Sequence, residues 1–350
     1  MDAPRLPLGA PLTFVPRLKH YLWGGRRLEQ LFGRVLPDGV TAESWEVSGH
    51  PDEPSVVDRG PLAGRDLPGL VAEYGLELVG RRGARAVKRG TFPLLVKLLD
   101  ASHALSVQVH PDDAYAAAHL PGETGKTEMW YVVEAEPGAR IIHGLQAGIG
   151  RAALRGAVAE GRVQDVLGRV PVRPGDSVMV PAGTVHGLLS GIVLVEVQQT
   201  SDTTYRIYDW DRVGPDGKPR ELHVERALEV IEFGRREPAL VEPRVAGEGA
   251  GIRREVVAEC EHFVVERVRA EGGAVFEGSA DGETFEIWGT LEGKAALGGV
   301  GSVAGSGSPG AEGSPALQME TARFALLPAT MGRYEFRAGT DVVALRAYLP

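Results

Sequence analysis

One short stretch, Leu105 to His110 (LSVQVH), alternates apolar and polar residues strictly. Successive side chains of a β-strand point to opposite faces, so Ser106, Gln108 and His110 share one face and three apolar residues share the other. A strand that packs against a solid apolar core would not present Ser, Gln and His to that core. We therefore predict that this strand lines a cavity.

Alternation or short apolar runs predict further strands along most of the chain. In the run 192–198, Glu196 falls on the face opposite the valines and becomes a second carboxylate directed at the cavity, in addition to Glu128. In continued strand register, Asp202, Thr204 and Arg206 share one face. The other predicted strands are 43–48, 92–99, 170–180 with a central turn, 263–268, 285–291, 324–327 and 342–348.

Helical spacing of apolar residues is confined to a few segments. The predicted helices are 67–79, 112–119, 151–167 and 221–233. With so few helices, and with 47 glycines and 24 prolines to form turns, the fold is expected to be mainly β with a few connecting α-helices.

A weak internal repeat divides the chain. Residues 324–330 (FALLPAT) echo residues 178–184 (VMVPAGT), and residues 285–289 (FEIWG) echo residues 127–131 (TEMWY). The second copy has no histidine at the matching place. We predict two barrels of common architecture, of which only the first has a metal site.

A chain of 350 residues exceeds the usual size of a single core, which agrees with two domains. The expected catalytic domain, 1–240, includes N-terminal strands and helical connectors. A smaller C-terminal β-barrel domain without metal is expected at 241–350. It contains a Gly- and Ser-rich loop at 298–314, which its composition predicts to be flexible.

Composition excludes several classes of protein. Hydrophobic residues make up 43% and charged residues 24%, which is too apolar for a disordered chain. A net charge of −9 argues against a nucleic-acid partner. The apolar runs are too short for a signal peptide or a membrane span, so we expect a cytoplasmic protein with no membrane partner. Cys260 is the single cysteine, which excludes an intramolecular disulfide.

Residues that commonly bind metals accompany the cavity strand. Glu128 follows His110 along the chain, and His186 comes directly after a turn at 181–183. We expect Gln108, His110 and Glu128 to lie on two strands of one sheet. Two imidazoles, a carboxylate and an amide oxygen suit Zn²⁺ or a similar divalent ion with an open position for substrate.

Two lysines also fall in predicted strands. Lys126 lies two positions before Glu128 and shares its face. Lys97 interrupts the apolar run 92–99, where it either extends to the strand end and reaches water or projects into the cavity as a substrate ligand.

Five motifs together resemble the type I mannose-6-phosphate isomerases in their short bacterial form. They are FPLLVK at 92–97, QVHPDD at 108–113, GKTE at 125–128, PAGTVH at 181–186 and SDTTYR at 201–206. Their order and spacing cover most of residues 15–235. The resemblance implies two cupin-type jelly-roll barrels and one Zn²⁺ per chain.

The resemblance also implies roles for single residues. The zinc ligands fall on His110, Glu128 and His186, with Gln108 in addition. The catalytic residues fall on Arg206, Lys126 and Asp202. We expect the other cavity-facing residues, Ser106, Lys97 and Glu196, to contact substrate. Gly125 departs from the pattern, because some longer members of the family have a histidine there, and the long helical insertion of those members is also missing.

The implied reaction is the reversible isomerisation of mannose 6-phosphate and fructose 6-phosphate through an enediol-type intermediate. A proton moves between C1 and C2, so the site needs a proton carrier and a group that holds charge developing on oxygen. Glu196, Asp202, Lys126 and metal-bound water are the candidates for the carrier.

Two other classes keep similar ligands. One is a non-catalytic, regulatory cupin that binds sugar phosphates, and the other is a non-haem iron cupin oxygenase. Lys126 and Arg206 argue against both, because an oxygenase of an uncharged substrate gains nothing from these cations. The expected partner is a small sugar phosphate, and the expected state is a monomer or homodimer.

Overall fold

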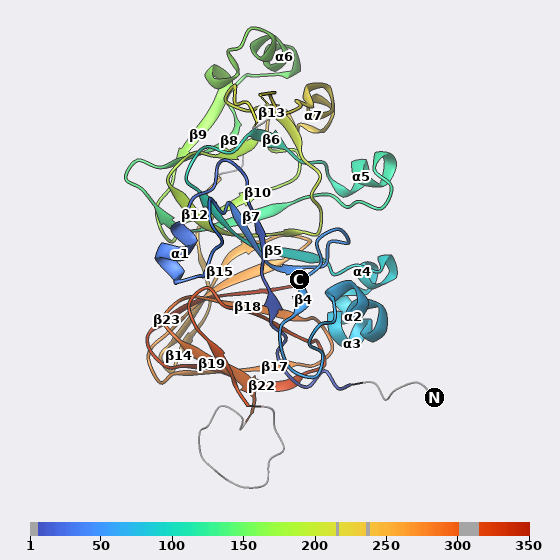
Figure 1. The fold of residues 1–350 in the computed structure, drawn as a ribbon, viewed down its shortest axis with the longest axis vertical. Helices are drawn as coiled ribbons and strands as arrows, with labels where there is room; N and C mark the ends of the chain where they lie inside the picture. The colour runs from blue at the N-terminus through green and yellow to red at the C-terminus, as the bar shows by residue number, and fades with distance from the viewer. Residues whose placement is uncertain (1–5, 215–216, 236–238, 301–314) are drawn as a thin grey trace. The chain divides into compact units, whose positions relative to one another are not determined.

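The protein is described here from a computed structural model, over residues 6–214, 217–235, 239–300 and 315–350. Short β-strands joined by turns are the main regular structure of these residues, with a few short helices between the strands (Figure 1). The mainly β fold with connecting helices is therefore confirmed. No described helix has the length and apolar character needed to cross a membrane.

The chain divides into two compact units. The first, here called the site unit, comprises residues 18–44 and 96–241, and the second, the C-terminal unit, comprises the described residues up to 17 together with 45–95 and 242–350. The site unit ends at Val241, and the expected domain boundary was at residue 240. Residues 45–95, however, were expected in the catalytic domain and group with the C-terminal unit. Local patterns of polarity give no information about which barrel a strand joins.

Two sheets form the frame of the site unit. The six-stranded sheet has the order β10 (Ser177–Val180), β7 (Glu128–Ala135), β12 (Ile192–Gln199), β5 (Leu94–Ala101), β3 (Glu43–Ser48) and β2 (Arg17–Lys19). The five-stranded sheet has the order β13 (Tyr205–Tyr208), β6 (Val107–Val109), β11 (His186–Leu188), β8 (Arg140–Leu145) and β9 (Leu167–Pro171). β2, β3 and β5 each contribute residues to both units.

Apolar side chains from both sheets form one core cluster. Trp130 and Leu194 of the six-stranded sheet pack in it with Ile141 and Leu188 of the five-stranded sheet. The two sheets therefore face one another across a shared interior.

The five-stranded sheet also has an apolar outer face. Val107 and Val109 of β6 belong to a second core cluster, which includes Leu154 of helix α6 (Arg151–Ala159) and Leu228 of helix α7 (Val224–Val230). The apolar residues of β6 thus face helices on the outside, and its polar residues face inward. This arrangement explains the unusual alternation at 105–110.

Glycines and caps decide where the helices end. The predicted helix 67–79 is two helices, α2 (Leu67–Tyr74) and α3 (Leu76–Val79), because Gly75 between them has a φ of 51°. The prediction of one helix over 151–167 was wrong, since α6 ends at Ala159, Gly161 has a φ of 68°, and a 3₁₀ turn precedes β9. Helix α7 is shorter than the predicted 221–233.

Helix α5 (Asp113–His119) agrees with the prediction of a helix at 112–119. The Asp112 carboxylate accepts a hydrogen bond from the Tyr115 backbone N–H and caps the helix. The remaining short helices, α1 (Arg27–Phe32) and α4 (Ala84–Arg89), were not predicted.

The C-terminal unit repeats the sheet arrangement. Its six-stranded sheet has the order β14 (Arg244–Gly249), β15 (Ile252–Glu259), β16 (Val264–Ala270), β23 (Val342–Tyr348), β18 (Glu286–Glu292) and β21 (Phe324–Leu327). Its four-stranded sheet has the order β17 (Val275–Ala280), β22 (Gly332–Ala338), β19 (Ala295–Gly299) and β20 (Leu317–Met319).

The strand pairing supports the internal repeat. In the site unit Glu128 lies opposite Val180, the residue before Pro181, and in the C-terminal unit Glu286 lies opposite Leu327, the residue before Pro328. Glu286 is therefore the repeat equivalent of Glu128. Of the predicted loop 298–314, residues 301–314 lie outside the described residues.

Glu286 is buried inside the C-terminal unit and held by an arginine. Nε and Nη2 of Arg346 donate to the two oxygens of the Glu286 carboxylate, each at 2.6 Å. Trp288 Nε1 and the Tyr334 hydroxyl donate to the same carboxylate. A second carboxylate, Glu266, lies 3.3 Å from Nη1 of Arg346. A buried carboxylate with this many donors is fully neutralised by the chain itself.

The variant Arg346→Met should lower the free energy of unfolding by about 3 kcal/mol, because it leaves a carboxylate buried without its counter-charge. Denaturant unfolding of the purified protein measures the loss. Arg333→Met is the matched control, because the Arg333 side chain is 71% exposed and its pair with Glu277 lies at the surface. Equal stability of the two variants would contradict the role given to Arg346.

Candidate functional site

A cavity of about 290 Å³ opens between the two sheets of the site unit. Eight of the ten residues predicted from the sequence line it: Lys97, Ser106, Gln108, Lys126, His186, Glu196, Asp202 and Arg206. The other two, His110 and Glu128, are only 1% exposed and lie beside Lys126 and His186. The structure therefore brings the whole predicted set together.

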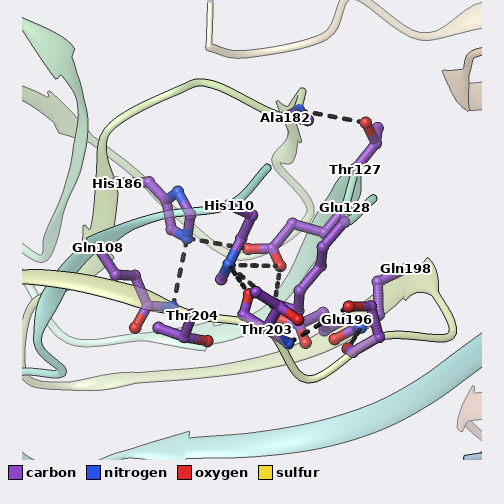
Figure 2. Close-up of polar contacts among 12 residues, drawn as sticks. Gln108, His110, Thr127, Glu128, Ala182, His186, Glu196, Gln198, Thr203 and Thr204 are labelled. Carbon is purple, nitrogen blue, oxygen red and sulfur yellow. Dashed lines mark hydrogen bonds and ion pairs between the residues drawn. The ribbon is translucent and has the colours of Figure 1, made fainter. Parts of the chain in front are cut away.

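His110, Glu128 and His186 form the candidate metal centre. Their ligand atoms all lie within 4.8 Å of one another, and all three residues are buried. Figure 2 shows both imidazole rings and the carboxylate directed at the same point. Within the described chain, no other group of three or more His, Cys, Asp or Glu side chains has this geometry.

The expectation that Gln108, His110 and Glu128 share one sheet was wrong. Glu128 begins β7 of the six-stranded sheet, whereas Gln108 and His110 belong to β6 and its end in the five-stranded sheet. Alternation fixes the face to which a side chain points but gives no information about the sheet. The centre is consequently closed from two opposing sides.

Backbone carbonyls orient both imidazoles. Nδ1 of His110 lies 2.8 Å from the carbonyl oxygen of Thr203, and Nδ1 of His186 lies 2.8 Å from that of Thr184. A carbonyl oxygen can only accept, so each Nδ1 carries the hydrogen and each Nε2 presents its lone pair to the centre. In this tautomer each ring can bind a metal ion through Nε2.

The environment keeps both rings neutral. Burial, together with the nearby Lys126 ammonium, lowers the pKa of His110. Burial, with His110 and Lys126 beside it, lowers the pKa of His186 to about 3, against the opposing effect of Glu128. Neutral imidazoles are the form that binds a cation.

Glu128 supplies the negative charge. Its burial acts to raise its pKa, but the opposing charge of the Lys126 ammonium is the largest effect that lowers it, and the pKa lies well below its usual range. Oε2 accepts from Lys126 Nζ at 2.5 Å, while Oε1 is buried with no hydrogen-bond donor among the described residues. An unpartnered buried carboxylate oxygen is costly, and a bound cation would satisfy it. The donor set therefore fits a divalent metal ion.

Strand register aligns Gln108 with two other site residues. Gln108 on β6 lies opposite His186 on β11 and opposite Arg206 on β13. Its side-chain nitrogen lies 3.3 Å from Nε2 of His186, and its oxygen accepts from the Ser106 hydroxyl at 3.1 Å. His186, Gln108 and Arg206 are therefore neighbours across the sheet, in this order from the metal centre outward.

Lys97 projects into the cavity and does not reach water. Its ammonium lies 3.2 Å from Glu196 and 3.8 Å from Glu43, and its side chain is 5% exposed. Burial acts to lower the pKa of Lys97, but the two carboxylates outweigh it and raise the pKa. Burial and the charge of Glu128 raise the pKa of Glu196, whose carboxylate also accepts from Trp130 Nε1 at 2.9 Å.

Comparison with known proteins agrees with this geometry. A family model described as the catalytic domain of phosphomannose isomerase type I matches residues 12–135. The mannose-6-phosphate isomerase of Streptococcus mutans is 44% identical over 228 residues, which are 65% of this chain and 70% of that protein. A putative mannose-6-phosphate isomerase of Bacillus subtilis is 37% identical over 288 residues, 82% of this chain and 87% of that protein.

A solved structure covers almost the whole chain. The crystal structure of the mannose 6-phosphate isomerase from Bacillus subtilis superposes with a TM-score of 0.83 at 32% identity, over 97% of this chain and 100% of that one. The chain belongs to the type I phosphomannose isomerase family. The expected pair of cupin-type jelly-roll barrels is thereby confirmed.

The space around position 125 accounts for the glycine that this chain has where some longer members of the family have a histidine. A Cβ at this position would lie 2.5 Å from the backbone nitrogen of Asp113 and 2.6 Å from the carbonyl carbon of Asp112. The histidine that stands here in some longer isomerases would therefore require the N-terminus of α5 to move.

Some cavity residues carried no clear signal in the sequence. Tyr21, Trp23, Glu43 and Arg220 line the cavity but were not predicted to do so. Tyr21 and Trp23 lie in a turn closed by a hydrogen bond from the Gly24 backbone N–H to the Tyr21 carbonyl oxygen, so no alternation indicated their position. Arg220 follows a stretch without periodicity, so nothing local indicated its position.

Zn²⁺ should raise the melting temperature of chelator-treated protein, because the metal binds only the folded centre. At a free concentration 100 times the dissociation constant, the added stability is about 2.7 kcal/mol. Thermal unfolding with and without ZnCl₂ measures the shift, which should disappear in Glu128→Gln. Glu160→Gln, with a side chain 58% exposed, is the control. A full shift in Glu128→Gln would show that the metal binds elsewhere.

Proposed function

We propose that this protein is a metal-dependent isomerase that interconverts mannose 6-phosphate and fructose 6-phosphate through an enediol-type intermediate. The observation that carries the proposal is the buried His110, Glu128 and His186 centre at the base of a cavity lined by cationic side chains. Family membership supports the same reaction.

Zn²⁺ is the proposed metal, one ion per chain, with His110, Glu128 and His186 as ligands and Gln108 beside them. Two imidazoles and one carboxylate are a common donor set for catalytic zinc. When bound, the metal supplies a Lewis acid that holds charge on the oxygens at C1 and C2.

Among the chain's own groups, Lys126 and Asp202 are assigned to proton handling. Lys126 lies at the metal end of the cavity, where its ammonium can donate to an oxygen that gains charge. Asp202 lines the cavity, and its carboxylate makes no hydrogen bond or ion pair with another described residue, so it is available to carry the proton between C1 and C2. Glu196 is already engaged by Lys97 and Trp130 and is assigned to positioning Lys97 against the substrate.

Ser106 is proposed to contact a substrate hydroxyl, because its side chain lies on the cavity wall next to Gln108. The protein is further proposed to be cytoplasmic and to act as a monomer or homodimer. The acidic net charge and the small polar cavity support a small-molecule substrate.

A coupled assay for fructose 6-phosphate formed from mannose 6-phosphate tests the proposed reaction. The metal-loaded protein should turn over, and treatment with a chelator should abolish turnover until Zn²⁺ is restored. A regulatory cupin would bind the sugar phosphate without turnover, and an iron oxygenase would contain iron and consume oxygen. Either result would overturn the proposal.

Arg206→Ala should lower kcat/KM with mannose 6-phosphate by about 10²–10³-fold, because the substrate and its transition state lose a half-buried cationic donor. Arg206→Lys should recover only part of the activity, since lysine restores the charge but not the paired donors. Zinc per chain is measured on the same samples and should stay unchanged. Loss of zinc in proportion to activity would assign Arg206 to the metal centre instead.

A further inference from the structure

A second arginine, Arg220, lines the cavity together with Arg206. Arg206 lies on β13, opposite Gln108 on β6, and Gln108 lies opposite the candidate metal ligand His186 on β11. Neighbouring strands are about 4.8 Å apart, so the Arg206 backbone is about 10 Å across the sheet from that of His186. Arg206 is therefore attached to the cavity wall away from the metal centre, and Arg220 lies close enough for its charge to act on Arg206.

Arg206 has an unused donor. Its Nη1 donates to the carbonyl oxygen of Glu221 at 2.8 Å, whereas its Nε is buried and has no hydrogen-bond partner in the part of the chain that the structure describes. A buried N–H without an acceptor is costly unless a ligand supplies one.

Positive charge at this end exceeds the negative charge that faces it. Arg220 donates to Asp209 through Nε at 2.7 Å and Nη2 at 2.5 Å, and Arg212 donates to the same carboxylate at 2.5 Å. The Asp209 carboxylate thus binds two arginines, Arg212 and Arg220, and can balance the charge of only one of them. Arg206 is a third cation near this pair. Burial and the charge of Arg220 lower the pKa of Arg206.

The other acidic groups nearby do not cancel this excess. The Glu221 side chain is 84% exposed and screened by water. Asp202 lines the cavity and acts on Lys97. The cavity lysines, in contrast, are already paired, Lys126 with Glu128 and Lys97 with Glu196.

The loop that carries Arg220 is anchored to the cavity wall. Trp210 Nε1 and Arg212 Nη1 donate to the carbonyl oxygens of Leu105 and Ala104, each at 2.6 Å, directly before Ser106. Arg212 and Asp209 are therefore positioning residues, which hold the Arg220 guanidinium group at the edge of the cavity.

We propose that Arg206 and Arg220 together bind the phosphate of a phosphorylated open-chain sugar, with the carbonyl end of the sugar directed at the metal centre. The inference rests on the proposed function, in which the reacting carbons and the phosphate lie at opposite ends of the substrate. Paired guanidinium donors match phosphate oxygens, and the 37% exposure of the Arg220 side chain suits the end of the substrate nearest water.

Binding of sorbitol 6-phosphate to the metal-loaded protein tests the proposal, because this polyol phosphate has no carbonyl and is not isomerised. Isothermal titration calorimetry should show that Arg220→Ala weakens binding by about 10–100-fold, the cost of losing hydrogen bonds to a charged group. Arg220→Lys should bind with intermediate affinity. Sorbitol, which lacks the phosphate, should bind the wild type and Arg220→Ala equally weakly.

Arg173→Ala is the matched control, because it also removes one positive charge from the site unit but at a side chain that is 87% exposed. Its affinity for sorbitol 6-phosphate should equal that of the wild type. Unchanged binding in a folded Arg220→Ala, or equal loss in Arg173→Ala, would overturn the proposal. Binding that depends on Arg220 in a protein without isomerase activity would instead refute the proposed reaction and leave the phosphate site standing.

Discussion

The site unit depends on one electrostatic arrangement, a buried carboxylate that faces two neutral imidazoles and an ammonium group. Glu128 and Lys126 come from the six-stranded sheet side, and His110 and His186 come from the five-stranded sheet. Desolvating such a cluster is costly, so it persists only where every oxygen and nitrogen has a partner. Side chains from the two facing sheets supply most of these partners. One oxygen of the Glu128 carboxylate is left for a cation.

The reversed polarity of β6 follows from this arrangement. A strand of a two-layer barrel normally turns its apolar side chains to the interior, but here the interior holds charge at one end. Val107 and Val109 are instead covered by helices α6 and α7 on the outside. The helices therefore replace, on the outer face, the apolar burial that the polar interior cannot provide.

Much of the site could be predicted from the sequence because it lies in strands whose alternation fixes the inward face. Ser106, Gln108 and Glu196 line the cavity as alternation predicted, and the resemblance added roles for His186 and Arg206. The sheet to which Glu128 belongs could not be predicted, because strand parity carries no information about long-range pairing. The predicted helix ends were wrong where a glycine adopts a positive φ, as at Gly75. Arg220 was missed because its position depends on the anchoring of a loop to Ala104 and Leu105.

The repeat equivalent of Glu128 leads to a different consequence. In the site unit a carboxylate is left with an open oxygen, whereas in the C-terminal unit Glu286 is bound by Arg346, a cation that is part of the chain. A tethered guanidinium cannot dissociate and has no dependence on the supply of metal in the surroundings. The site unit can therefore exchange its central cation with solution. In the C-terminal unit the cation is a side chain of the same polypeptide, so it is in place as soon as the unit folds and it stays there.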